Sequence, residues 1–307
     1  MLNYALRRVL VAIPTLFILI VITFLLMHAA PGGPFTSEKP PPPLVLANIE
    51  AKYGLNDPLI VQFWNYLVGV VTAFDFGPSF KYKDRTVNDI IAQGFPITLT
   101  YGTLSFLAAT LIGGSLGIIA AIRKNSIIDY FAVGISIGAQ VLPNFVMAPL
   151  LVWLFTLVLG WLPGGGWNGG AWQNLIMPVI ALSTSYMASI ARITRSSMLE
   201  VLSSNFIRTA RAKGLPERTV ILRHALKPSL LPLISYLGVA FVGMITGSVI
   251  IDVYFSTGGM GQAFVNSATN RDYAVMMGIT ILLGSLTIAF SLLADLLYAW
   301  VDPKIRY

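Results

Sequence analysis

The run from Val9 to Ala30 contains no Asp, Glu, Lys or Arg, and it is long enough for a helix to cross a lipid bilayer. Arg7 and Arg8 precede it, as basic residues precede a secretion signal, but the uncharged run is longer than a signal core. The residues after it match a cleavage site poorly, so we expect an uncleaved membrane helix. Composition agrees, because only 11% of the 307 residues are charged, too few for a water-facing surface of this size.

Further apolar runs bring the number of expected spans to six, which predicts an all-α integral membrane protein. The six spans are expected at residues 9–30, 98–122, 131–159, 174–191, 229–251 and 273–301. The third run is long for one crossing and carries Pro143 and Pro149, so we expect a kink or an interfacial segment there.

The basic residues lie unevenly in the connections between these runs. If the N-terminus is cytoplasmic, fourteen of the 20 Lys and Arg residues fall in inside segments and six in outside segments. Cytoplasmic connections are enriched in Lys and Arg. The sequence therefore predicts that both termini are cytoplasmic, and this topology accounts for the net charge of +7 without a nucleic-acid partner.

Two outside segments carry aromatic residues. In the long one we expect polyproline structure at 40–43 and short helices at 44–53 and 58–71, with Phe63, Trp64 and Tyr66 at the membrane interface or on a docking surface. The loop 161–172, WLPGGGWNGGAW, lies between two spans, and not between a strand and a helix. It is therefore interpreted as an interfacial aromatic belt with flexible turns, and not as a phosphate cradle.

Some polar and small residues lie inside the expected spans. Ser183, Ser185 and Ser189 either line a wetted pathway or bond to their own backbone. Asp295 is a functional candidate, or an interfacial residue paired with a basic group. Glycines four residues apart predict close helix packing. These glycine pairs are Gly113 and Gly117, Gly134 and Gly138, and Gly243 and Gly247.

Residues for catalysis or metal binding are not brought together by the expected topology. His28 and His224 lie near opposite membrane faces, the chain has no cysteine, and it has no phosphate loop of the G-x-x-x-x-G-K-[ST] type. We therefore expect no catalytic residue, no metal site and no ATP site in this chain.

The stretch RTARAKGLPERTVILRHALKPSLLP, which starts at Arg208, is far more basic than the rest of the chain. We expect one helix from residues 203–205 to Lys213, a stop at Gly214, and a second helix from Pro216 to about Leu226. Such a hairpin can attract anionic lipid or fit a groove on a cytoplasmic partner. Small residues at its corner favour a partner that approaches closely; these are Ala210, Ala212 and Gly214.

The stretch resembles the ATPase-coupling loop of permease subunits in bacterial binding-protein-dependent ABC importers. The usual motif is Glu-Ala-Ala, three residues, then Gly, and here Arg208 replaces the Glu and Thr209 the first Ala. RTARAKGL followed by RHALKP resembles the peptide and nickel branch. FDFGPSFKYKDRTVNDII, LPGGGWNGG, NRDY and the ending DPKIRY are most similar to the B subunits of oligopeptide permeases.

The resemblance implies a type I ABC importer permease fold in the bacterial inner membrane. The implied parts are an N-terminal helix (1–30), a periplasmic segment (31–96), a five-helix core (97–301) with a cytoplasmic coupling loop (192–227), and a cytoplasmic tail (302–307). The implied partners are a second permease (C subunit), two ATPase subunits that bind ATP and Mg, a periplasmic peptide-binding protein, and membrane lipid. The implied coupling residues are Arg208, Thr209, Ala210, Arg211, Ala212, Lys213, Gly214, Leu215 and Pro216.

Alternatives remain at two levels. The same architecture serves dipeptide, cell-wall peptide, glutathione or nickel uptake. A secondary transporter would show intramembrane charges or inverted repeats, for which Asp295 alone is thin support. An intramembrane enzyme would need a nucleophile and a base at the same depth, and a lipid-binding scaffold would not need an ordered hairpin.

Overall fold

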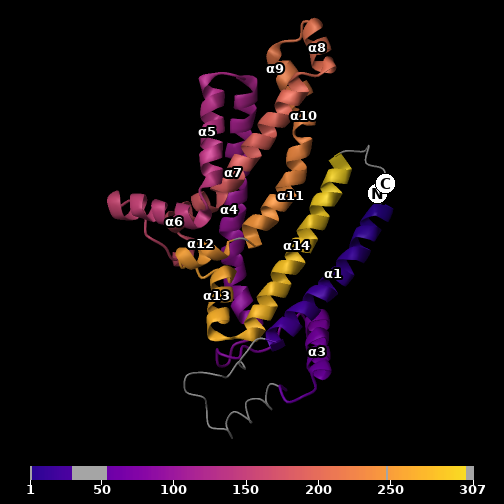
Figure 1. Cartoon of the computed structure of the whole chain (residues 1–307), viewed down its shortest axis with the longest axis vertical. Coiled ribbons are helices and arrows are strands. Elements are labelled where there is room, and N and C mark those ends of the chain that lie inside the picture. Colours follow the sequence, from indigo (N-terminus) through magenta and orange to yellow (C-terminus); the bar gives the residue numbers. More distant parts are fainter. Residues whose placement is uncertain (1, 30–53, 247, 302–307) are drawn as a thin grey trace.

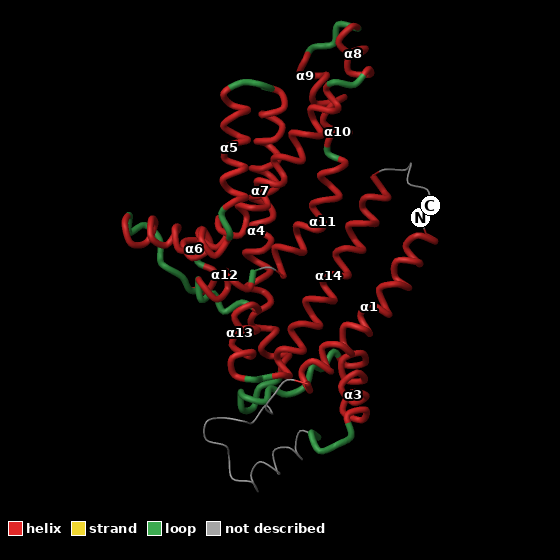
Figure 2. Tube along the Cα trace, viewed as in Figure 1, coloured by secondary structure: helices red, strands yellow, loops and turns green. Residues whose placement is uncertain are grey.

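The structure is a computed structural model that describes residues 2–29, 54–246 and 248–301. Over these residues the regular elements are helices, and one isolated β-bridge joins Pro78 to Thr86. Figure 2 shows this helical content along the trace. The expectation of an all-α chain is confirmed. The polyproline stretch and the first short helix expected between residues 31 and 53 lie outside the described residues.

Within the described ranges, five helical segments are long and apolar enough to cross a membrane, and there are six if one bent pair counts as a single span. The five spans other than the bent pair lie in α1 (Leu2–Ala29), α4 (Val87–Ile122), α7 (Trp172–Leu202), α11 (Leu231–Thr246) with α12 (Val249–Tyr254), and α14 (Tyr273–Val301). The shorter elements are α3 (Leu59–Val68), η1 (Gly69–Ala73), η3 (Asn168–Gly170), α8 (Asn205–Ala212), α9 (Glu217–Thr219), η4 (Val220–Ala225), α10 (Leu226–Ser229) and α13 (Met260–Asn270).

The third expected span is a bent pair. Helix α5 (Ile127–Val141) meets α6 (Asn144–Val152), which continues as η2 (Trp153–Val158), at an angle of 101°. The break falls at Leu142, whose extended backbone (ψ 110°) suits the residue before a proline. Figure 1 shows α6 running across the direction of α5. The proline therefore produces the expected interruption, and α5 alone is only 15 residues long.

Helices α4 and α7 pack along much of their length (Figure 1). An added Cβ at Gly113 would lie 2.5 Å from the carbonyl oxygen of Met187, and one at Gly117 would lie 2.5 Å from that of Ala191. This glycine pair packs closely, as expected. In contrast, a Cβ at Gly134 or Gly138 would meet no atom within 4 Å.

The two aromatic segments that were expected outside the membrane pack onto neighbouring helices. Phe63 of α3 contacts Phe24 of α1 edge to face with ring centroids 5.3 Å apart, whereas Trp64 is exposed. In the loop before α7, the Gly166 N–H donates to the Phe255 carbonyl (2.6 Å), and a Cβ at Gly165 would lie 2.4 Å from that same oxygen. The glycines of this loop thus allow close contact with the end of α12.

The helices run between two ends of the molecule, and different elements lie at each end. In Figure 1, the start of α1, the end of α14 and the α8–α9 segment lie toward one end, and α3 lies toward the opposite end. This relative arrangement is the one expected for termini and basic loop on the same membrane side. The assignment of that side to the cytoplasm stays a prediction.

Candidate functional site

The turn between α8 and α9 has the hydrogen bonds of a Schellman motif. The Leu215 N–H donates to the Ala210 carbonyl (3.4 Å), and the Gly214 N–H donates to the Arg211 carbonyl (2.9 Å). Gly214 has φ +75°, a left-handed conformation that glycine adopts without strain. The expected helix stop at Gly214 is therefore present.

An ion pair bridges this turn. Arg211 donates two hydrogen bonds to the Glu217 carboxylate, from Nε at 3.1 Å and from Nη2 at 2.5 Å. The hydrogen bond from Arg211 lowers the pKa of Glu217, and the Glu217 carboxylate raises the pKa of Arg211. Both side chains are exposed, so the pair contributes little free energy but favours one angle between the two helices.

A small hydrophobic core attaches the hairpin to the membrane helices. Ile207 and Ala210 of α8 lie together with Val220 of η4, Met198 of α7 and Ala121 of α4, and each of these side chains is buried. We call this group, with Ala225, the anchor core. The buried side chains of α8 therefore pack directly against the ends of α4 and α7.

The nine residues that the resemblance assigned to coupling divide by exposure. Ala210 is buried in the anchor core, so the interpretation of this small side chain as room for a partner is wrong. The other eight face outward on the hairpin. These exposed residues are Arg208, Thr209, Arg211, Ala212, Lys213, Gly214, Leu215 and Pro216.

The second helix of the hairpin is less regular than expected. It begins after Pro216 as α9, widens into the π-helical turns of η4, and continues through α10 to Ser229. The widened turns place Val220 and Ala225 in the anchor core while Leu222 stays exposed.

The three serines proposed for a pathway lie on α7. Ser183 is 7% exposed and donates to the Ile180 carbonyl (3.2 Å), and Ser189 donates to the Ser185 carbonyl (3.2 Å). The hydroxyls of Ser183 and Ser189 therefore bond to their own helix, as the simpler interpretation requires. Ser185 and Ser189 are half-buried.

Helix α7 extends beyond its expected end. The fourth span was expected to stop at Ala191, but α7 continues to Leu202, so Arg192 and Arg195 lie inside a helix and not in a loop. Arg195 donates to both carboxylate oxygens of Asp129, at 2.5 and 2.8 Å, and Asp129 is almost fully buried. This pair holds the first turn of α5 against α7. The sequence analysis did not identify this pair; the available signal was an acidic residue two positions before the third expected span.

A second buried carboxylate lies inside the fifth span, where the sequence had suggested none. Asp252 accepts hydrogen bonds from the Thr257 hydroxyl (2.5 Å) and the Gly261 N–H (2.9 Å) and is fully buried. The Thr98 hydroxyl of α4 lies 3.4 Å from it and accepts from the Met260 N–H. Asp252 therefore joins α4, α12 and α13. Asp295 was named for this kind of role, and its side chain lies outside the described residues.

Among the described side chains, there is no cluster of three or more His, Asp or Glu residues that could hold a metal ion. His28 lies near α3, where its Nε2 is 3.1 Å from the Gln62 amide oxygen, and His224 lies in the hairpin, so the two histidines occupy opposite ends.

The fold and the hairpin together define a class: a multi-pass helical membrane protein with an anchored, basic, exposed helical hairpin at one end. The family of binding-protein-dependent transport system inner membrane components matches residues 113–307, and its N-terminal family matches residues 1–102. This chain belongs to that family of transport permeases. It is accordingly a multi-pass protein of the bacterial inner membrane.

Curated relatives and solved structures agree with this assignment. The oligopeptide transport system permease protein OppB of Salmonella typhimurium is 59% identical over 100% of both chains, and that of Haemophilus influenzae is 54% identical over 100% of both. An inward-facing structure of the MetNI methionine ABC transporter covers 70% of this chain and 97% of its own, with 17% identity and a TM-score of 0.57. The expected type I importer fold is confirmed.

Proposed function

We propose that this chain is a permease subunit of an ATP-driven importer of oligopeptides. The observation that carries the proposal is the full-length identity of 59% to an OppB protein, together with an exposed hairpin anchored to two spans. The Bacillus subtilis permeases for dipeptides (DppB, 40% identical) and for oligopeptides (AppB, 38% identical) are both less similar to this chain, so the choice of oligopeptides rests on the OppB proteins.

In the proposed mechanism, a second permease subunit completes the pathway and two ATPase subunits bind ATP and Mg. A binding protein delivers the peptide to the outer face. The exposed face of α8 and the α8–α9 turn fits a groove on one ATPase subunit. When the ATPases close, the anchor core carries the movement of α8 into α4 and α7, which shifts the pathway between inward- and outward-open states.

The proposed division of labour gives this chain no catalytic role. Its contribution is binding energy at the hairpin and a rigid link to the spans, while ATP hydrolysis belongs to the partner subunits. The hairpin is suited to this role because its exposed face carries basic side chains and its buried face is apolar.

The test is purification of the complex from native membranes, followed by reconstitution in vesicles. We expect two ATPases and a second permease to co-purify, and ATP-dependent uptake of a labelled oligopeptide when its binding protein is added. If the chain is recovered alone under conditions that keep another ABC importer intact, or if uptake needs no ATP, the proposal is wrong.

A further inference from the structure

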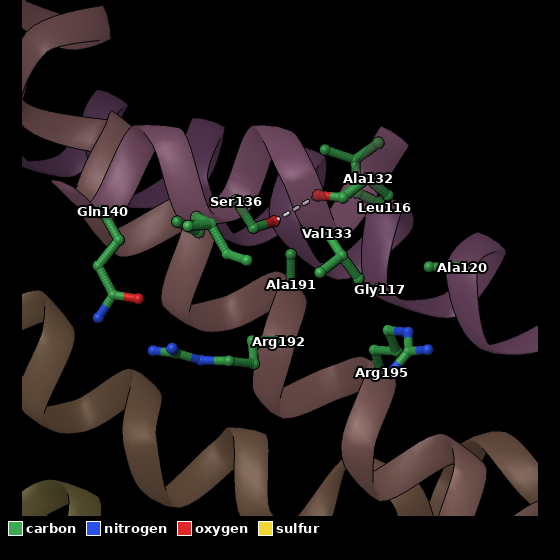
Figure 3. Close-up of a pocket in the computed structure, with 12 residues that line it drawn as sticks. Leu116, Gly117, Ala120, Ala132, Val133, Ser136, Gln140, Ala191, Arg192 and Arg195 are labelled. Carbon is green, nitrogen blue, oxygen red and sulfur yellow. Dashed lines mark hydrogen bonds between the residues drawn. The ribbon is translucent and has the colours of Figure 1, made fainter. Parts of the chain in front are cut away.

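A cavity opens among α4, α5 and α7 in the half of the molecule near the hairpin. Its volume is about 180 Å³, and most of its lining is apolar. Figure 3 shows its polar groups, Ser136 and Gln140 from α5 and Arg192 and Arg195 from α7. Ser136 donates to the Ala132 carbonyl (2.8 Å), so its hydroxyl is already partly satisfied.

The two arginines of this cavity differ in their partners. Arg195 is paired with Asp129 through two hydrogen bonds. Arg192 is exposed and has no salt bridge to any described acidic side chain. Because the Arg192 side chain is exposed, its guanidinium is open to water and to a bound anion.

The depth of Arg192 is fixed by α4. Gly117 packs against the Ala191 carbonyl beside Arg192, and it lies five residues before the end of α4 at Ile122, roughly 8 Å along the helix. On α5, Ile127 and Tyr130 are exposed apolar side chains around Asp129, the partner of Arg195. Apolar surface therefore begins nearer the hairpin than Arg192 does.

The direction of the Arg192 side chain indicates whether its guanidinium faces lipid or the substrate pathway. An arginine that faces lipid extends its guanidinium toward the nearer membrane surface. Figure 3 shows the Arg192 guanidinium on the side of Gln140, away from Arg195 and thus away from the hairpin end. This orientation suits a water-filled space that a polar substrate crosses, and it does not suit a lipid headgroup at the surface.

We propose that Arg192, with Gln140 of the same cavity lining, binds the C-terminal carboxylate of the transported peptide during its passage. A guanidinium matches a carboxylate with two parallel hydrogen bonds. The carboxylate is present on every peptide whatever its side chains, so such a contact serves an importer of varied sequences. This inference rests on the proposed function and adds a residue of this chain to the substrate path.

The experiment uses the complete importer in lipid nanodiscs and vesicles with two peptides of one sequence, one ending in a free carboxylate and one in an amide. Arg192→Gln is compared with Arg192→Lys and with Arg123→Gln, a basic residue at the end of α4 outside the cavity lining. We expect Arg192→Gln to lower uptake of the free-acid peptide about tenfold relative to the amide, the effect of one charged hydrogen-bonded contact. Arg192→Lys should retain part of the preference, and Arg123→Gln all of it.

The readout is the ratio of the two uptake rates in each variant. Any preference of the binding protein is common to all variants, so a change in the ratio belongs to the permease. An unchanged ratio in Arg192→Gln overturns the inference, and so does an effect that vanishes when the vesicles contain only neutral lipid, since that would assign Arg192 to lipid phosphate. If the unsubstituted importer takes up neither peptide, the proposed function itself is wrong.

Discussion

Gly214 combines two roles at the corner of the hairpin. Its φ of +75° is required by the Schellman turn, and a Cβ there would meet no atom of this chain within 4 Å. The constraint within the subunit is therefore conformational, while the open space beside it is available for a partner to approach. These two effects can be separated by substitution.

Gly214→Val should destabilise the turn by about 1–2 kcal/mol, because a β-branched residue is strained in the left-handed region. We expect substrate-stimulated ATP hydrolysis and uptake to fall together while membrane insertion is unchanged. Gly214→Asn is the matched control, since Asn tolerates this conformation. Full stimulation in the Val variant would contradict a tight contact at this corner.

Asp252→Ala should destabilise the region where α4, α12 and α13 meet. The substitution leaves the Thr257 hydroxyl and the Gly261 N–H without their acceptor, at about 1–3 kcal/mol for each buried donor. Thermal melting of the detergent-solubilised complex measures this loss. Asp252→Asn keeps one acceptor oxygen, so its melting temperature should lie between those of the unsubstituted complex and Asp252→Ala. An unchanged melting temperature for Asp252→Ala would contradict the role of Asp252 in joining the three helices.

At the scale of elements, the anchor core matters more than the exposed ion pair. Arg211 and Glu217 are both largely exposed, so their pairing is screened by water. Ile207 of α8 is fully buried and packs against the ends of α4 and α7. The hairpin is therefore held mainly by apolar packing, and its ion pair adjusts the angle of the turn.

Ile207→Ala should loosen α8 from the membrane helices, because truncating a buried Ile costs about 2–5 kcal/mol. We expect hydrogen exchange in α8 to accelerate and stimulation of ATP hydrolysis by loaded binding protein to fall. Leu111→Ala, at an exposed position of α4, is the control and should change neither. Normal coupling with a loosened α8 would show that movement passes by another route.

The pH dependence of the hairpin follows from the depressed pKa of Glu217. A carboxylate whose pKa is lower in the folded chain stabilises the fold above its unfolded pKa, and this contribution is lost as pH falls through the folded value. We expect the turn to loosen slightly in acid, and Glu217→Gln to abolish that response. Hydrogen exchange of the α8–α9 segment, measured from neutral pH down through the pKa of Glu217, reports this loosening.

At the scale of the whole molecule, the hairpin lies toward the end where α1 begins and α14 ends, and α3 and the start of α14 lie toward the opposite end. At that opposite end, Asp272 accepts hydrogen bonds from the Ser79 hydroxyl and from the Phe80 N–H (3.2 Å), which ties the loop before α4 to the start of α14. The two ends of the molecule thus differ in structure, and the predicted topology places them on opposite sides of the membrane.

Sidedness can be measured directly because the chain has no native cysteine. We expect a cysteine at Lys81→Cys to react with an impermeant reagent added outside, and one at Arg211→Cys to react only after the membrane is opened. Both side chains replaced are exposed, so reactivity reports access and not burial. The reverse labelling pattern would overturn the topology predicted from the basic residues.

The membrane spans and the hairpin of this protein could be predicted from its sequence. Long uncharged runs predict spans because a bilayer accepts few charges, and Gly-Leu-Pro between basic helices predicts the hairpin because glycine and proline act on the backbone locally. Tertiary structure alone decided which side chains meet. The placement of Ala210 in the anchor core, the pairing of Asp129 with Arg195, the burial of Asp252 and the depth of Arg192 all depend on contacts between distant segments. The apolar pattern of a membrane span does not predict such contacts, because lipid-facing and core-facing positions both carry apolar residues.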